Sequence, residues 1–147
     1  MEVNAWFIAF FVLMWIVGPL TQLLQLIAPE LHHRLGLTEA GALKPEFKWY
    51  LLEERAIAYA DLTCLVSGIA FVWLALLDKS SALIFGLYSC ACYVYAASIS
   101  IPRWLLLAKH ELSPQPGRQM PAYVSYMVLY LLFGLYGLFY LWGLVQP

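Results

Sequence analysis

The stretch from Ala5 to Ala28 reads AWFIAFFVLMWIVGPLTQLLQLIA and contains no charged residue. A membrane-spanning α-helix needs about 20 mostly apolar residues, because each residue advances the helix by about 1.5 Å and the hydrocarbon core is about 30 Å thick. The stretch is preceded by Glu2 and by no Lys or Arg, and it exceeds the roughly 7–15 apolar residues of a secretory signal peptide. We therefore expect a retained transmembrane helix with a kink at Gly18-Pro19.

Three further segments of this kind follow, at residues 58–77, 82–101 and 122–145. Together with residues 5–28 they make up more than half of the 147 residues, so little is left for a separate soluble domain. The sequence predicts a single all-α domain, residues 1–147, in which four transmembrane helices form a bundle.

Two proline residues refine the helix boundaries. Pro45 suits the first position of a helix, so we expect the second helix to start there and to reach Leu77, a length of about 50 Å. After Pro102, residues 103–112 mix Trp and Leu with Arg, Lys and His. This mixture is typical of a short helix lying in the membrane interface.

The composition excludes several classes of protein. Hydrophobic residues make up 63% of the chain and charged residues 12%, with a mean hydropathy of +0.76. Soluble domains have about 45–50% apolar and about 25% charged residues. With a net charge of −1, the chain is not expected to bind nucleic acid. A disordered chain and an ordinary cytosolic enzyme are also excluded.

The basic residues predict the orientation in the membrane. The loops at residues 29–57 and 102–121 hold seven of the eight, namely Arg34, Lys44, Lys48, Arg55, Arg103, Lys109 and Arg118. Lys79 lies alone between the second and third spans. Because basic loops stay in the cytoplasm, we expect both loops there and both termini on the other side. A bacterial inner membrane or an endoplasmic reticulum would suit this asymmetry.

Asp61 is the candidate that stands out, because it falls about one turn inside the apolar part of the second span. Acids within membranes are costly and are often functional. Glu54 lies seven residues earlier and shares its helical face, and Arg55 follows Glu54. We expect Asp61, Glu54 and Arg55 to carry any catalytic role. The alternative is that the charges before Asp61 are ordinary headgroup-level residues and that Asp61 pairs with Arg103 or a backbone donor.

The other spans place polar side chains at the same depth. We expect a ligand-binding pocket in the cytoplasmic half of the bundle, lined by Gln22, Gln25, Tyr59, Tyr123, Tyr126 and Tyr130. The alternative is that these residues tie the helices together by hydrogen bonds.

Cysteine and histidine predict no metal or cofactor. All three cysteines fall within spans, without a Cys-x-x-Cys motif, so they are expected to be packing residues. Cys92, Ala96 and Ser100 form a ridge of small residues, for which Gly134 and Gly137 offer a groove. The spans contain no histidine, which excludes a transmembrane haem held by two histidines.

Two families show partial resemblance. Glu54-Arg55-Ala56 resembles the Glu-Arg-Ala stretch of the membrane-associated eicosanoid and glutathione (MAPEG) enzymes, which would imply a glutathione-transferase-like activity. Pro19-x-Thr21, the residues from Phe47 to Glu54 and the Tyr-rich last span are similar to the emopamil-binding and sigma-2-like (EXPERA) group. That resemblance would imply a sterol isomerase or a sterol-ligand protein.

Three functional classes remain besides the MAPEG-type enzyme. The first is a protein that binds or transforms a sterol-, terpenoid- or lipid-like molecule, as an isomerase or a transferase would. The second is a structural or regulatory subunit that partners another membrane protein or a second copy of the chain. The third is a small transporter with Asp61 as its coupling residue, which the scarcity of intramembrane charge disfavours.

Overall fold

The computed structural model describes residues 3–38, 40–114 and 120–146. The described chain is 86% helical and has no strands. In chain order its elements are α1 (Ala5–Trp15), the π-helical segment η1 (Ile16–Leu20), α2 (Thr21–Ile27), α3 (Pro29–Arg34), the 3₁₀ turns η2 (Ala40–Leu43) and η3 (Pro45–Phe47), α4 (Lys48–Leu76), α5 (Ala82–Lys109) and α6 (Met120–Val145).

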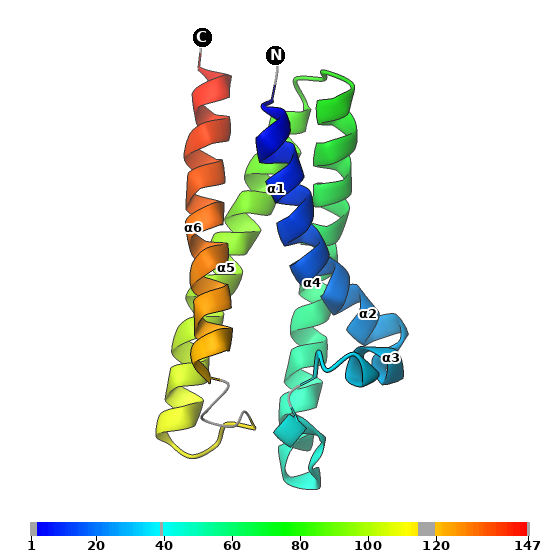
Figure 1. Cartoon of the computed structure of the whole chain (residues 1–147), viewed down its shortest axis with the longest axis vertical. Coiled ribbons are helices and arrows are strands. Elements are labelled where there is room, and N and C mark those ends of the chain that lie inside the picture. The colour runs from blue at the N-terminus through cyan, green and yellow to red at the C-terminus, as the bar shows by residue number, and fades with distance from the viewer. Residues whose placement is uncertain (1–2, 39, 115–119, 147) are drawn as a thin grey trace.

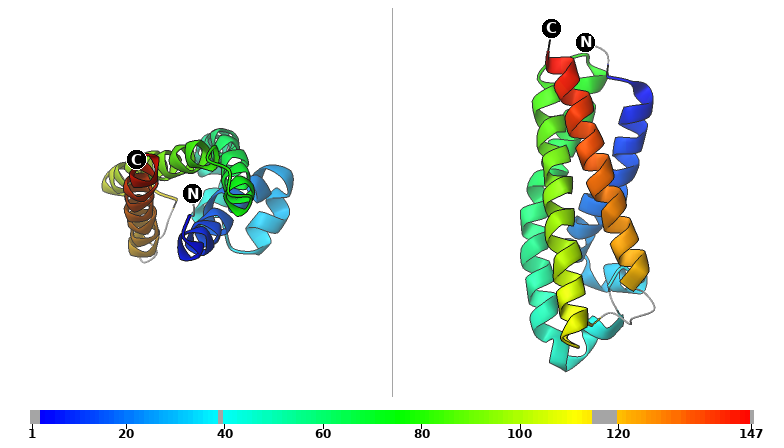
Figure 2. Two further views of the ribbon diagram at one scale, coloured as in Figure 1. Left: turned by 90° about the horizontal axis from the view of Figure 1, so that it is seen from above. Right: turned by 90° about the vertical axis from the view of Figure 1, so that its left-hand side faces the viewer.

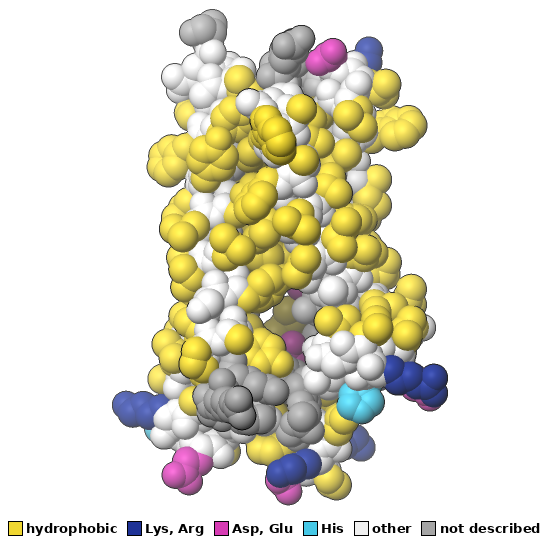
Figure 3. All heavy atoms as spheres, viewed as in Figure 1, with side chains coloured by type: hydrophobic (Ala, Val, Ile, Leu, Met, Phe, Trp, Pro, Cys, Tyr) yellow, Lys and Arg dark blue, Asp and Glu magenta, His cyan; other side chains and the backbone are white. Residues whose placement is uncertain are grey.

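Four helical stretches in the described residues are long and apolar enough to cross a membrane: Ala5–Ile27, Pro45–Leu76, Ala82–Lys109 and Met120–Val145. Both ends of the chain lie at the same end of the bundle (Figure 1), which we call the terminus end, and the other is the loop end. Hydrophobic side chains cover the middle of the face seen in Figure 3, and charged side chains gather at its two ends. This arrangement supports a multi-pass membrane protein.

The second and third spans differ in how closely they match the prediction. The helix that begins at Pro45 runs through α4 to Leu76, close to the expected Leu77. Helix α5 continues through Pro102 to Lys109, so residues 102–109 are helix and not loop, and no separate interfacial helix follows Pro102. A proline removes one backbone hydrogen bond, and transmembrane helices tolerate this when neighbouring groups compensate. The predicted basic residue Arg118 lies outside the described residues.

Aromatic side chains fill the bundle near the terminus end. Phe11 is fully buried and its ring lies 4.6 Å from Phe71, 5.8 Å from Tyr93 and 6.2 Å from Phe133, measured between ring centroids. Phe7 stacks on Phe133 at 5.7 Å. Helices α1, α4, α5 and α6 are therefore joined by one continuous aromatic cluster.

Helices α5 and α6 lie side by side in both views of Figure 2. A Cβ atom at Gly137 would overlap the Cys90 sulfur, and one at Gly134 would lie 2.8 Å from the Cys90 carbonyl oxygen. The glycine groove therefore receives Cys90, and the predicted ridge of Cys92, Ala96 and Ser100 lies elsewhere. Those three residues line a cavity instead.

The first transmembrane helix changes direction at η1, which contains Pro19. In π-helical register the carbonyl of Met14 would be paired with the N–H of residue 19, which proline lacks. The Tyr130 hydroxyl of α6 donates to this carbonyl at 2.6 Å instead. Gly18 makes room for the tyrosine, because a Cβ atom there would overlap the Tyr130 hydroxyl. Beyond this point α2 leads away from the bundle axis (Figure 1).

Candidate functional site

A cavity of about 600 Å³ lies where α2 has turned away, in the half of the bundle towards the loop end. Its walls come from η1, α2, α4, α5 and α6, together with His32 of α3 and the following residues Leu37 and Thr38. A hollow with acidic side chains inside it is visible on the molecular surface (Figure 3). Ligand-binding cavities are commonly about 300–1,000 Å³, so this one has room for a small molecule.

Glu53, Glu54 and Arg103 form an ion-pair group on one wall of the cavity. The Arg103 Nη1 atom donates to Glu54 Oε1 at 2.6 Å, and Nη2 donates to Glu53 Oε2 at 2.8 Å. The Arg103 guanidinium also lies 4.8 Å from the centre of the Tyr50 ring, in cation–π contact. The guanidinium is thus held by two carboxylates, which fixes α5 against α4.

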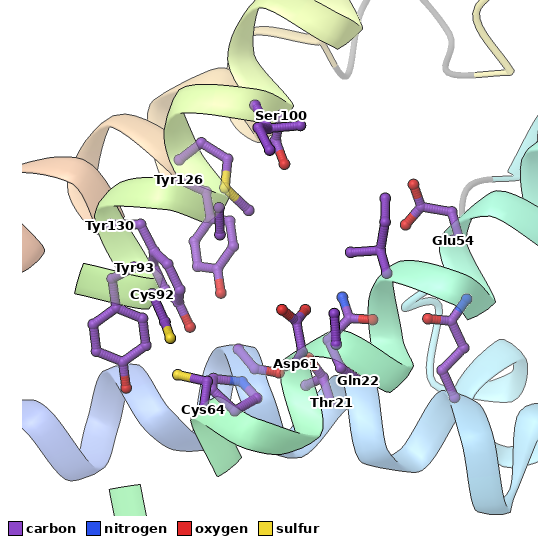
Figure 4. A pocket seen from close by; sticks show the side chains of 18 of the residues that line it. Thr21, Gln22, Glu54, Asp61, Cys64, Cys92, Tyr93, Ser100, Tyr126 and Tyr130 are labelled. Carbon is purple, nitrogen blue, oxygen red and sulfur yellow. Dashed lines mark hydrogen bonds between the residues drawn. The ribbon is translucent and has the colours of Figure 1, made fainter. Parts of the chain in front are cut away.

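Asp61 lies two turns after Glu54 on α4, and its side chain points into the cavity (Figure 4). Within the described ranges its carboxyl group has neither an ion pair nor a hydrogen bond. Asp61 therefore does not pair with Arg103, as one interpretation of the sequence would have it. Arg103 forms ion pairs with Glu53 and Glu54 instead. A carboxyl group facing a cavity without a protein partner is available to a bound molecule.

The α2 side chains supply amide groups on the same side as Asp61, because α2 packs against α4 (Figure 4). The Gln22 Oε1 atom is buried and has no hydrogen-bond partner among the described residues. Gln25 is 8% exposed and lines the same cavity. Thr21 is already satisfied, since its hydroxyl lies 2.6 Å from the Gly18 carbonyl. The two glutamines make no hydrogen bond between helices in this part of the structure, so they do not serve as interhelical ties.

Two of the predicted tyrosines line the cavity beside a third that the sequence did not single out. The Tyr126 and Tyr93 rings each lie 4.9 Å from the Tyr130 ring. Tyr130 is an interhelical tie through its bond to Met14. The Tyr93 hydroxyl is buried, has no partner in the described residues and points away from Asp61 (Figure 4), so it does not face the space beside Asp61.

Three predicted site residues lie outside this cavity. Tyr59 is 66% exposed, because it precedes Asp61 by two residues and so lies about 200° around the helix. Arg55 lines a different, smaller cavity. Tyr123 packs edge-on against Trp104 at 5.6 Å. The predicted residues that do meet are Gln22, Gln25, Glu54, Asp61, Tyr126 and Tyr130.

Arg103, Tyr93 and Cys92 line the cavity without having been predicted as site residues. In the sequence Pro102 predicts the end of the span, which would place Arg103 in a loop, whereas α5 continues to Lys109. Cys92 and Cys64 point towards one another in Figure 4, and both are free thiols. Nothing in the sequence separates Cys92 from the packing cysteine Cys90.

The lining is acidic, amide-bearing and phenolic, with one guanidinium that is already paired. No three His, Cys, Asp or Glu side chains among the described residues come together as a set of metal ligands. What the cavity offers is hydrogen bonding at Asp61 and Gln22, with apolar surface around them. No protein family, characterised protein or solved structure matches this chain.

Proposed function

We propose that the protein binds or transforms a lipophilic small molecule, of sterol-, terpenoid- or lipid-like chemistry, in the cavity at the loop end. The observation that carries the proposal is the carboxyl group of Asp61, which faces a cavity of about 600 Å³ without a protein partner. A polar group left unpaired in a membrane is costly. A ligand hydroxyl, which both donates and accepts a hydrogen bond, would satisfy Asp61 together with Gln22.

The ligand would reach the cavity from the membrane. The hollow in Figure 3 opens on the side of the bundle, where a spanning helix bundle faces lipid. Six of the seven basic residues that the structure describes lie towards the loop end, namely Arg34, Lys44, Lys48, Arg55, Arg103 and Lys109, so we place this end on the cytoplasmic side. A lipophile from the inner leaflet would then enter laterally, with its polar end towards Asp61.

If the ligand is transformed, we favour an isomerisation. One carboxyl group can give a proton to one carbon of a double bond and take a proton from a neighbouring carbon, with no net change in protons or electrons. Asp61 would be this acid and base, and Tyr126 would lie along the ligand. A glutathione-transferase-like reaction is less favoured, because Arg103 is occupied by Glu53 and Glu54 and is not free to bind the carboxylates of glutathione.

The test is mass spectrometry of lipids extracted from the purified protein, compared with the Asp61→Asn variant. Asp78→Asn is the matched control, because Asp78 is exposed in the turn between α4 and α5 at the terminus end. We expect a specific lipophile with the wild type and the control, and its loss from the folded Asp61→Asn protein.

Equal retention by all three proteins would overturn the proposal. Loss of a partner protein in place of a lipophile would support the role of a subunit. A proton-gradient-driven flux in liposomes, absent from Asp61→Asn, would support transport.

A further inference from the structure

A second cavity, of about 290 Å³, lies at the loop end between α3 and the start of α4. It is lined by Gln25, Pro29, His32, His33, Thr38, Leu43, Lys48, Leu51, Leu52 and Arg55. Three of these residues, Gln25, His32 and Thr38, also line the first cavity and so form the wall between the two. The wall is fixed, because His32 is 5% exposed and its Nδ1 atom lies 2.9 Å from the Thr38 hydroxyl.

The second cavity is basic. Lys48 and Arg55 lie seven residues apart on α4 and therefore share one face of the helix. Neither makes an ion pair within the described ranges, and no Asp or Glu is among the described residues of the lining. His33 adds a further group able to donate a hydrogen bond. The first cavity is the opposite case, since its guanidinium is neutralised and its acid Asp61 is unpaired.

The position of this cavity along α4 matches the headgroup layer of a membrane. The stretch Pro45–Leu76 has 32 residues, which corresponds to about 48 Å and exceeds a hydrocarbon core of about 30 Å. The excess belongs to the end that holds Lys48 and Arg55, because the rest of the helix is the apolar part. Leu43, Leu51 and Leu52 lie beside the basic groups, so cationic and apolar surface meet at one site.

We propose that this cavity binds the phosphate group of an anionic phospholipid. Lys48 and Arg55 would contact the phosphate oxygens, and the three leucines would lie along the first part of an acyl chain. Basic pockets beside transmembrane helices are suited to this chemistry. The phosphate contacts proposed here involve neither Asp61 nor the space beside it. The test of this site is therefore independent of the test of the function proposed above.

The experiment is native mass spectrometry of the full-length protein in detergent, with equal amounts of dioleoyl phosphatidylglycerol and dioleoyl phosphatidylcholine. We expect preferential retention of the anionic lipid. The preference should fall about fivefold in Lys48→Gln and in Arg55→Gln, and about thirtyfold in the double variant, given the usual contribution of one basic residue near a membrane surface. Lys109→Gln is the matched control, since Lys109 is an exposed basic residue at the end of α5.

The control should keep the full preference. An unchanged preference in the double variant would overturn the proposal, as would an equal loss in Lys109→Gln, which would mean general attraction to a basic end. A second arm adds inorganic phosphate at millimolar concentration. Failure of phosphate to displace the lipid supports the phospholipid, whereas full displacement overturns the lipid as the ligand and leaves free phosphate in its place.

Discussion

The two halves of the bundle use the same four spans and differ in whether the first and last helices touch. Near the terminus end the backbone N–H of Asn4 donates to the Tyr140 hydroxyl at 2.8 Å, and the Phe7 and Tyr140 rings lie 4.7 Å apart. Towards the loop end, α2 and α6 stand on opposite walls of a cavity. The change occurs at η1, where Pro19 interrupts the helix.

The comparison teaches that stability and binding capacity are separated along the bundle axis. Packing of aromatic side chains holds the terminus half together, while the loop half keeps polar groups unpaired around a space. Substitutions in the first half should therefore act on the free energy of unfolding, and substitutions of the unpaired groups should not. Substitutions of Arg103 and Gly18, whose contacts shape the loop half, should have intermediate effects on the free energy of unfolding.

The largest effect is expected for Phe11→Ala. Phe11 is fully buried among aromatic rings, so its removal leaves a cavity and should lower the free energy of unfolding by about 3 kcal/mol. Phe139→Ala is the control, because Phe139 is 78% exposed and should change it by less than about 0.5 kcal/mol. Unfolding in mixed micelles measures both. Equal effects would mean that the terminus half is not held by packing.

Arg103→Gln should lower the free energy of unfolding by about 2 kcal/mol, because it removes the 2.6 Å ion pair to the Glu54 carboxylate, whose side chain is 14% exposed. Lys44→Gln removes the more exposed contact to Glu46, at 3.9 Å, and should cost less than about 0.5 kcal/mol. The same unfolding assay applies. A result for Arg103→Gln as small as that of the control would mean that the ion pairs do not hold α5 against α4.

Gly18→Ala should lower the free energy of unfolding by about 1 kcal/mol. The new methyl group would displace the Tyr130 hydroxyl, at a cost of about 1–3 kcal/mol, and the better helix propensity of alanine offsets about 1 kcal/mol. Gly143→Ala has open space around it and should leave stability unchanged or slightly raised. A stabilised Gly18→Ala protein would mean that Tyr130 does not hold α6 to the first helix.

The smallest effect is expected for Asp61→Asn, which should change the free energy of unfolding by less than about 0.5 kcal/mol or raise it. Asp61 has no partner in the described structure, so its replacement loses no protein contact, and a neutral amide is less costly in a membrane than an acid. Thermal unfolding in detergent without added lipid measures this. A marked loss of stability would mean that Asp61 is structural, and the two halves would then not differ as described.

The sequence predicts the four spans, because length and hydropathy alone decide them, and the helix beginning at Pro45, because proline suits the first position of a helix. It also brings Glu54 and Asp61 to one cavity, since seven residues return a helix to the same face. The sequence does not predict which face of each helix is turned towards the cavity. For that reason it also selects Tyr59, which lies outside the cavity. The pairing of Arg103 with Glu54 spans 49 positions and depends on α5 continuing past Pro102, which local preference opposes.

The hydrogen bond between the Tyr130 hydroxyl and the Met14 carbonyl lies at the end of the cavity that is nearer the termini. The first helix lacks one N–H hydrogen at Pro19, and the last helix supplies one from a phenol. The first and last helices are therefore joined at this level, and they separate from one another towards the loop end. The proline and the tyrosine must therefore stand at matching levels of their helices, because moving the proline by one turn would carry the unpaired carbonyl about 5.4 Å away from the Tyr130 hydroxyl.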